Sequence, residues 1–576
     1  MAFERLNRQD EYFLDNDFVT APTHIGGLEI YRLPEGAGRD YIQELHEQLR
    51  RTPVRAEPFN YRLETIEPER PESKSLLGRL RPGVLRGRKP KPFRAWVRLD
   101  KVNVDEHIHL HALPHPGGQR ELGELVARLH VNRLDRSRPL WEVHLIEGLE
   151  GGRFAWYTKL HHSQFDGKRG MELSRYVRST DSSKRGMPPM WGIDLKKMRA
   201  QAARAPGKKV PAPEPSTLQS LASWGTALKK VGEMSLGKPD AGKIGPYSAP
   251  ASILNGTLTA RRRLGTVSLS INRMRAIGAA VPGGATVNEI LLAVCGGALR
   301  RYLKDQRALP RRALIAACPV ARERAGDAAS GNAVGQILVS LGTDVANPRR
   351  RLLAVVASSR ANKGLMHELD SDTYQNYTQL SMIPQILAAK TMFAHRVLNA
   401  NLVISNVPGP REKQYLNGAL LESMYATSLL LSGQALNITV SNFGDNLDMG
   451  ILACPDLCPS PQRIAVYAGE EIETLERALG LKPPSGAHEG RTAAKRKTRR
   501  AAAPGGRVAG ASKKTPRAST MRGSTSRRRS GPARARKKAA QVRTVLAAKK
   551  APRRGTTRGS KKAAPRGSTA RGPKKA

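Results

Sequence analysis

The sequence predicts a mixed α/β (α+β) fold built in two halves, and three observations support this prediction. Segments with the two-residue alternation of strands are interspersed with segments of helical spacing up to about residue 480. Lys, Arg, Pro, Ala, Gly and Ser dominate residues 181–250, which indicates a connector. Large apolar residues become rare after about residue 487. We therefore expect an N-terminal domain at 1–180, a linker at 181–250, a C-terminal domain at 251–486 and a tail at 487–576.

The net charge of +48 is unevenly distributed along the chain. Residues 491–576 contain 30 Lys or Arg and no Asp or Glu, which leaves 67 basic and 49 acidic residues, a surplus of 18, for residues 1–490. A segment of this composition cannot bury a core, so we expect a disordered tail. Its charge predicts non-specific binding to polyanions such as DNA, although a solvated tail without one fixed partner is the plainer interpretation.

Cysteine content and hydropathy indicate the cellular compartment in which we expect the protein. The four cysteines, Cys295, Cys318, Cys454 and Cys458, are too sparse for a disulfide framework, and we expect buried, reduced thiols. The N-terminus lacks the apolar stretch of a secretory signal, and no run of 18 apolar residues predicts a membrane-spanning helix. We expect a cytoplasmic protein that can still lie on a membrane surface.

The N-terminal half shows strand and helix patterns in alternation. We expect a strand at 25–31, a helix at 39–52, a basic loop at 68–92, a strand at 102–113 and a helix at 121–134. Strands at 141–146 and 153–160 follow, and the turn Glu150-Gly151-Gly152 between them is typical of a hairpin. One helix at 218–230 is expected inside the connector.

Three histidines alternate along the expected strand at 102–113. His107, His109 and His111 would share one face of that strand, which is compatible with a metal site. No acidic partner or further metal motif lies nearby in the sequence, so we favour a structural role for them.

The C-terminal half repeats the mixture of strands and helices. We expect strands at 266–270, 313–320 and 401–405, a hairpin of 434–441 with 447–453, and helices at 272–280, 290–303, 370–397 and 464–479. Thr286 and Glu289 fit a capping box, in which Thr286 precedes the first turn and Glu289 occupies its third position.

The motif HHSQFDG at 161–167 carries the strongest chemical signal. It follows the expected strand 153–160, so its histidines stand at the end of an ordered element. Adjacent side chains alternate between the faces of a strand, so one of His161 and His162 should face a cleft while the other packs inward. A neutral imidazole can accept a proton from a hydroxyl group. Asp166 can brace the turn, and Gly167 interrupts the regular backbone after it.

Local chemistry alone leaves several interpretations of this motif open. A histidine is more often structural than catalytic, and two histidines with an aspartate could instead bind a metal ion. The residues by themselves therefore predict a candidate site without deciding between general-base catalysis, metal binding and a structural role.

Further motifs give the chain a family resemblance. HHSQFDG fits the HHxxxDG pattern of CoA-dependent acyltransferases. Together with Pro139-Leu140-Trp141, Thr286-Val287-Asn288, SNVPGP at 405–410 and Leu436-Asn437-Ile438, it resembles the bacterial wax ester synthase/diacylglycerol acyltransferase family over residues 4–480. HHxxxDG alone is shared with chloramphenicol acetyltransferase, carnitine acyltransferases and peptide-synthetase condensation domains, so the combination with the other motifs carries the assignment.

The resemblance implies a fold, a reaction and a set of site residues. The fold is two similar chloramphenicol-acetyltransferase-like subdomains, each a mixed sheet with helices, and the site lies in a tunnel between them. The reaction transfers an acyl group from acyl-CoA to the hydroxyl of diacylglycerol or of a long-chain alcohol. His162 is implied as general base. The other implied site residues are His161, Asp166 and Gly167 in the motif, and Asn288, Pro139, Leu140 and Trp141 as site-shaping groups.

The same resemblance implies acyl-CoA as co-substrate with no metal or other cofactor, and peripheral contact with a membrane or lipid-droplet surface. Glu289 departs from the family, which usually has Asp after the asparagine, and the basic tail is not part of the family pattern. Two alternatives stay open. The chain could be a nucleoid- or lipid-granule-associated protein acting through its tail, or an enzyme of related condensation chemistry, which the absence of a carrier domain disfavours.

Overall fold

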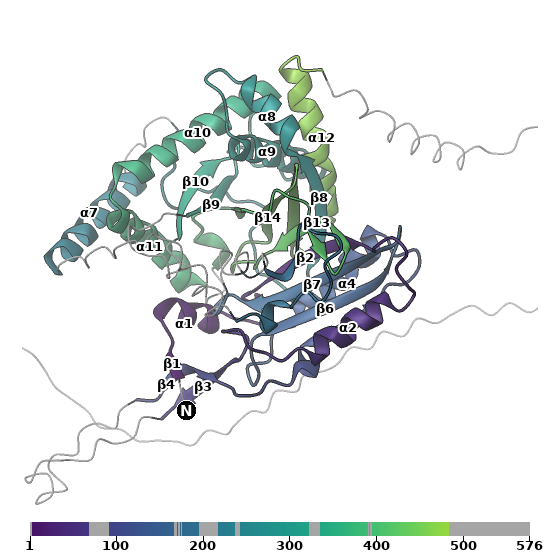
Figure 1. Ribbon diagram of the computed structural model, residues 1–576. Helices are drawn as coiled ribbons and strands as arrows, with labels where there is room; N and C mark the ends of the chain where they lie inside the picture. Colours follow the sequence, from purple (N-terminus) through teal and green to yellow (C-terminus); the bar gives the residue numbers. More distant parts are fainter. Residues whose placement is uncertain are drawn as a thin grey trace, which may run out of the picture. The chain divides into compact units, whose positions relative to one another are not determined.

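The computed structural model describes residues 3–67, 91–165, 170, 173, 176–194, 217–236, 242–321, 334–389, 391 and 394–482 (Figure 1). Two six-stranded mixed sheets with helices and one small three-stranded sheet account for the described strands. The predicted α/β class is therefore confirmed. The tail, and most of the basic loop expected at 68–92, lie outside the described residues.

The N-terminal sheet has the strand order β12-β13-β2-β7-β6-β5. Its neighbouring strands are antiparallel except β6 and β5, which are parallel. The bounds are Tyr415–Leu416 (β12), Ala419–Thr427 (β13), His24–Arg32 (β2), Arg153–His161 (β7), Trp141–Leu149 (β6) and Ile108–Ala112 (β5). The hairpin predicted from the Glu150-Gly151-Gly152 turn is confirmed as β6 and β7.

Side chains alternate across β7, and the two faces of the sheet pack against different helices. Phe154 and Trp156 share a buried cluster with α2 (Tyr41–Arg51), whereas Ala155 and Tyr157 pack with α4 (Gln119–Val131). Both helices are amphipathic, so each buries its apolar side against the sheet and leaves its polar side exposed. The strand that carries the histidine pair is therefore packed on both faces.

The C-terminal sheet has the order β10-β9-β11-β14-β15-β8, with parallel pairs only on either side of β11. The bounds are Val334–Ser340 (β10), Ile315–Ala321 (β9), Leu402–Val407 (β11), Leu436–Phe443 (β14), Asn446–Ala453 (β15) and Arg263–Ser270 (β8). The largest buried cluster joins this sheet to α8 (Ile271–Ala279), α9 (Val287–Asp305), α10 (Pro348–Glu368) and α12 (Gln462–Ala478).

Strand β13 crosses between the halves of the chain. It lies about 390 positions after β2 in the sequence, yet its residues 420–427 pair with β2 in the N-terminal sheet. A sequence pattern reports local periodicity and not the partner of a strand, so this exchange was not predicted. It ties the C-terminal part of the chain to the sheet that ends at the histidine pair.

Smaller elements complete the described fold. They are α1 (Arg8–Asp15), the sheet of β1 (Phe3–Arg5), β4 (Phe93–Arg98) and β3 (Tyr61–Ile66), the paired helices α7 (Thr217–Leu236) and α11 (Ser371–Ala388), and single helical turns at Val104–Glu106, Met190–Gly192 and Ala394–Arg396. The strand expected at 102–113 is wrong at its start, because a helical turn precedes β5. The helix expected at 370–397 ends at residue 388.

Two further findings bear on the cellular setting. Within the described part of the chain, no helix has the length and apolar character needed to cross a membrane. All four cysteines are buried and free, as predicted.

Candidate active site

The two histidines of the motif stand where β7 ends. His161 is the last residue of β7 and lies opposite His24 of β2. The N–H of His161 donates to the carbonyl of Leu140 at 3.1 Å, and the N–H of His162 donates to the carbonyl of Thr23 at 3.0 Å. His161 is buried and His162 is half-buried. The backbone of both neighbouring segments therefore holds the pair in place.

The imidazole of His161 is part of a buried hydrogen-bond chain. Its Nε2 lies 3.2 Å from Thr23 Oγ1 and 3.9 Å from Asp17 Oδ2. Its Nδ1 lies 2.7 Å from Ser163 Oγ and accepts the Ser163 N–H at 3.3 Å. Because Thr23 Oγ1 donates its own proton to the carbonyl of Phe13 at 2.9 Å, it is free to accept from His161. This assigns the proton of a neutral His161 to Nε2.

Asp17 anchors the other end of this chain. Its carboxylate accepts from Arg133 at 2.7 Å, from Arg136 at 3.2 Å and from the Thr23 N–H at 3.1 Å. Burial alone would raise the pKa of Asp17, but the nearby His161 imidazole and the hydrogen bonds from Arg133 lower that pKa well below its ordinary value. The carboxylate is therefore ionised at neutral pH and fixes the position of the Thr23 segment.

His162 has different surroundings. Its ring stacks on Phe13 of α1, with 4.2 Å between ring centroids and 12° between ring planes. Its Nδ1 is buried and has no hydrogen-bond partner among the described residues. Burial, and secondarily the neighbouring His161, lowers the pKa of His162 to about 4. The imidazole is therefore neutral at physiological pH, which is the form that can accept a proton.

The Pro139-Leu140-Trp141 segment lies next to the histidine pair and holds it through a backbone hydrogen bond. Pro139, Leu140 and Trp141 are all buried. The Leu140 carbonyl accepts the His161 N–H, and the indole N–H of Trp141 donates to the carbonyl of Phe59 at 2.9 Å. Leu140 therefore holds the backbone of His161, while the site-shaping role of the segment stays a prediction.

A crevice lined by both halves of the chain lies next to residues that contact His162. Phe13 and Thr23, which contact His162, line a narrow pocket whose other walls come from α11 and the segment after β13. A second pocket of about 430 Å³ shares three of its lining residues, Ala21, Ala389 and Ser432. We call these two pockets together the crevice; α11 contributes Met382, Gln385 and Ile386 to it, and Ala389 follows the end of that helix.

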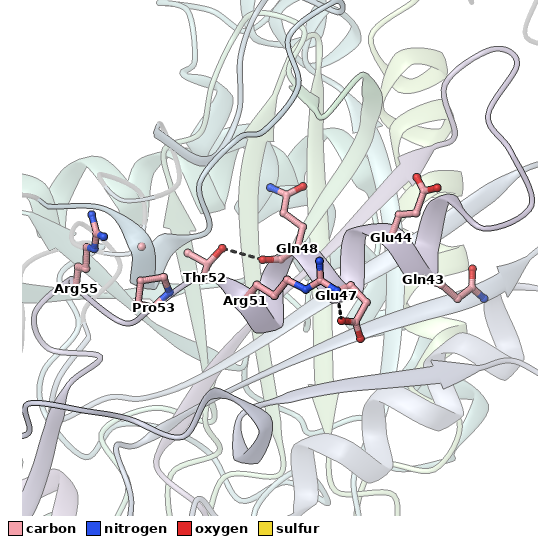
Figure 2. A pocket seen from close by; sticks show the side chains of 9 residues that line it. Gln43, Glu44, Glu47, Gln48, Arg51, Thr52, Pro53 and Arg55 are labelled. Carbon is pink, nitrogen blue, oxygen red and sulfur yellow. Dashed lines mark hydrogen bonds and ion pairs between the residues drawn. The ribbon is translucent and has the colours of Figure 1, made fainter.

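A larger groove lies elsewhere, along α2. Figure 2 shows its lining residues, which include Gln43, Glu47, Gln48 and Arg51. The groove has a volume of about 850 Å³, but neither the motif residues nor Phe13 and Thr23, which contact His162, line it. Two of its charged side chains, Arg51 and Glu47, pair with each other at 3.5 Å. Volume alone does not make this groove the candidate site.

Comparison with known proteins decides the family. Residues 71–291 match the wax ester synthase/diacylglycerol acyltransferase catalytic domain, and residues 330–476 match the WS/DGAT C-terminal domain. A probable diacylglycerol O-acyltransferase of Mycobacterium tuberculosis is 34% identical over 479 residues, covering 82% of this chain and 98% of the relative. The chain belongs to the wax ester synthase/diacylglycerol acyltransferase family.

Two further relatives agree with this membership. The O-acyltransferase WSD of Acinetobacter baylyi is 34% identical over 476 residues, covering 82% of this chain and 96% of the relative. The solved wax ester synthase/diacylglycerol acyltransferase of Marinobacter aquaeolei is 34% identical, with a TM-score of 0.63 over 83% of this chain and 100% of that one. The fold and the family implied by the sequence motifs are therefore confirmed.

Glu289, the residue expected to differ from the family pattern, takes part in the N-terminal cap of α9. Glu289 Oε2 accepts the Thr286 N–H at 2.8 Å, and the Glu289 N–H donates to Thr286 Oγ1 at 3.3 Å. The predicted capping box is therefore confirmed with Glu at this position. Asn288 stands half-buried in the same first turn of α9, and no hydrogen bond among the described residues links it to His161 or His162. Asp166 and Gly167 lie outside the described residues.

The other histidines do not form the array expected from alternation. His107 precedes β5, stacks on Trp141 with 4.2 Å between centroids, and its Nδ1 lies 2.8 Å from the Trp141 carbonyl. His109 and His111 instead neighbour His144, whose Nδ1 lies 3.1 Å from His111 Nε2. The expectation of one shared face is wrong, because the strand begins only at residue 108. Among the described residues, no three His, Cys, Asp or Glu side chains are arranged to hold a metal ion.

Sequence reasoning missed the residues that hold the histidine pair. Phe13, Asp17 and Thr23 lie in or after α1, more than 130 positions before the motif. Their side chains carry no local motif of their own. Tyr12-Phe13-Leu14 is visible only as an apolar patch, and a contact over that separation cannot be read from spacing.

Proposed function

We propose that this chain transfers a long-chain acyl group from acyl-CoA to the hydroxyl of diacylglycerol or of a long-chain alcohol, with His162 as the general base. The names of the relatives support the reaction class. The observation that carries the role of His162 is its position. Its backbone N–H donates to the Thr23 carbonyl, its imidazole is neutral, and the residues around it line a crevice formed by both halves of the chain.

The proposed chemistry needs no nucleophile from the enzyme, because a CoA thioester is already activated. His162 takes the proton of the acceptor hydroxyl while its oxygen attacks the thioester carbonyl. A C–O bond forms, and the tetrahedral intermediate collapses by breaking the C–S bond. The departing CoA thiolate then takes the proton from the imidazolium of His162. The products are the ester and free CoA, and the imidazole returns to its neutral form.

The remaining motif residues have supporting roles in this proposal. His161, held between Asp17, Thr23 and Ser163, is a positioning residue that fixes the backbone from which His162 projects. Asp166 organises the turn after the pair, and Gly167 gives that turn its backbone freedom. Asn288 and backbone N–H groups are the proposed donors to the oxyanion of the tetrahedral intermediate. A low pKa for His162 keeps the base unprotonated before the acceptor arrives.

We also propose peripheral attachment to a lipid surface and a separate role for the tail. The net charge of +48 suits CoA phosphates, anionic phospholipids and nucleic acid alike. The alternative function, a nucleoid- or lipid-granule-associated protein acting mainly through its tail, is favoured only by the 30 basic residues of 491–576. Deletion of 487–576 separates the two: it should remove DNA binding and leave acyl transfer intact. A full-length protein that binds DNA through this segment but has no acyl transfer would favour the tail-centred function.

The experiment for the proposed reaction identifies its product. Purified protein is incubated with palmitoyl-CoA and either diacylglycerol or hexadecanol, and CoA release is followed while the ester is identified by mass spectrometry. We expect acceptor-dependent release that His162→Ala abolishes. His367→Ala, which changes an exposed histidine on α10, is the matched control and should behave like the wild type. Release without any ester product, or release that His162→Ala leaves intact, would reject the proposal.

A further inference from the structure

Exposed apolar side chains are concentrated on one pair of helices. Ten large apolar side chains are exposed in the described part of the chain, and six of them belong to α7 and α11. These six are Leu221, Trp224, Leu228 and Leu236 on α7, with Ile383 and Leu387 on α11. Scattered single residues of this kind are ordinary on a protein surface, but their accumulation on two neighbouring helices indicates a contact surface.

Helix α7 has more apolar surface than its packing uses. Its Ala227 and Met234 are buried against α10 and α11, in a cluster that includes Tyr374. Leu221, Trp224 and Leu228 are spaced three and four residues apart, so they form one row along the helix. They are 67%, 40% and 63% exposed. We call these three residues the apolar stripe. The other exposed side of α7 carries Ala222, Thr226, Lys229 and Glu233.

Helix α11 connects this surface to the site. It lies beside α7, and the side-chain amide of Asn376 donates to Ser223 Oγ of α7 at 2.9 Å. Met382 and Ile386 of α11 line the crevice next to His162. Ile383 and Leu387, each one position further along, are 44% and 70% exposed. A single helix therefore lines the crevice and also presents apolar side chains to the surroundings of the molecule.

We propose that the apolar stripe of α7, together with Ile383 and Leu387 of α11, inserts into a phospholipid surface that carries the acyl acceptor. This inference rests on the proposed function, because diacylglycerol and long-chain alcohols are dissolved in a lipid phase. When α7 and α11 are inserted in the lipid, the lipid phase reaches the part of α11 that lines the crevice. The acceptor can pass from the lipid towards His162 along α11 without crossing bulk water.

Charge and amphipathicity favour a phospholipid surface over other occupants. A helix with leucine and tryptophan on one side and lysine on the other is typical of an element lying in a membrane interface. Exposed Lys229 stands on the polar side of α7, and the whole chain carries +48, which complements anionic phospholipids. The tail at 491–576 has few large apolar residues with which to cover the stripe. A second copy of the chain is the competing occupant that the test must recognise.

Tryptophan fluorescence gives a local readout of insertion. The chain has five tryptophans, and four of them, Trp96, Trp141, Trp156 and Trp191, are at most 4% exposed. Trp224 is the exposed one, and it belongs to the apolar stripe. Full-length protein is mixed with vesicles of phosphatidylcholine, phosphatidylglycerol and diacylglycerol that contain a brominated phosphatidylcholine as quencher. Binding through the basic tail brings the protein to such vesicles but does not place Trp224 among the acyl chains.

Two double variants of equal charge test the surface. Leu221→Glu with Leu228→Glu places two carboxylates in the apolar stripe, and Ala222→Glu with Thr226→Glu places two on the other side of the same helix. We expect quenching of Trp224 in the wild type and in the second variant, and its loss in Trp224→Phe. The first variant should lose the quenching and bind neutral vesicles at least about tenfold more weakly, since two leucines no longer enter the apolar phase.

The outcomes distinguish this inference from the proposed function. His162→Ala should bind and be quenched like the wild type, because insertion does not depend on catalysis. The first variant should keep acyl transfer to a short, water-soluble alcohol and lose transfer to diacylglycerol in vesicles. Wild-type protein that binds the vesicles without quenching of Trp224 would overturn the inference. A change from dimer to monomer in the first variant by light scattering, with no quenching in the wild type, would assign the stripe to a second copy instead.

Discussion

The ring of Phe13 lies flat against the imidazole of His162, with their centroids 4.2 Å apart. Helix α1 thus fixes the plane of the proposed base and excludes water from one of its faces. Phe13 also lines the crevice, so the same side chain contacts both the base and the space next to it. The stack links two segments that are about 150 positions apart in the sequence.

Removing this stack should change the pH dependence of the reaction. Burial lowers the pKa of His162 to about 4, so the base is fully available from about pH 5 upwards. In Phe13→Ala water reaches the imidazole, and the pKa should move up towards its ordinary value near 6.5. We expect the rise of kcat/KM with pH to shift upwards by about two units, which gives about a tenfold loss at pH 5. Phe3→Ala, the same change at an exposed position, should leave the profile unchanged. An identical pH profile in Phe13→Ala would show that the stack does not control protonation.

Asp17 should contribute stability through its charge. Its folded-state pKa is below the unfolded value near 3.9, so its contribution is complete above that unfolded pKa and is lost as pH falls further. Asp17→Asn removes the charge with little change of shape, and we expect a loss of about 1–3 kcal/mol at pH 7, since its two arginines are partly solvated. The deficit should shrink between pH 5 and pH 3. Urea unfolding at several pH values measures it.

The control for this prediction is Asp15→Asn. Asp15 pairs with Arg94 at 2.8 Å but is about half exposed, so its loss should cost less than about 1 kcal/mol. Equal deficits for the two variants, or a deficit at Asp17 that does not depend on pH, would contradict the charge-based account of the Asp17 cluster.

Variants of Glu289 test whether a glutamate in the capping box, where the family is expected to have an aspartate, affects stability or activity. Glu289→Gln and Glu289→Asp keep an acceptor for the Thr286 N–H, whereas Glu289→Ala removes it. We expect a loss of about 1 kcal/mol for Glu289→Ala and less than half of that for the other two. Activity should follow stability, because the cap holds the turn that carries Asn288. If Glu289→Asp changes kcat strongly without changing the thermal midpoint, the acid has a direct role in the site.

The cysteines should be chemically silent in the folded protein. All four are buried, and burial raises the pKa of Cys318 to about 12 and that of Cys458 to about 11. Thiolates are the reactive species, so native protein should not react with Ellman's reagent, whereas unfolded protein should release four equivalents. Iodoacetamide should leave acyl transfer unchanged. Inactivation by one equivalent would point to a cysteine in the reaction and against direct transfer.

Local patterns predicted most of the elements around the site. The apolar run at 153–160 predicted β7, Thr286 and Glu289 predicted the start of α9, and the glycine turn predicted the hairpin of β6 with β7. Each of these signals is contained within a few consecutive residues. The opposite orientation expected of adjacent side chains also agrees with a buried His161 and a half-buried His162.

Long-range contacts could not be predicted in the same way. The insertion of β13 beside β2, and the contacts of Phe13 and Asp17 with the histidine pair, depend on how the whole chain packs. The prediction of a strand at 102–113 was wrong at its start for a related reason. His107 lies between the helical turn at Val104–Glu106 and the start of β5 at Ile108, so the alternation of the histidines wrongly assigned it to a face of the strand.

The central claim is that His162 removes the proton of the acceptor hydroxyl. The most direct measurement is kcat/KM for acceptor-dependent CoA release by wild-type protein and by His162→Ala at pH 7.5, with circular dichroism and thermal unfolding confirming that both are folded. General-base catalysis contributes about 10²–10⁴-fold, so a loss of that size at an unchanged thermal midpoint is predicted. A folded His162→Ala protein whose kcat/KM stays within about threefold of the wild type would contradict the claim.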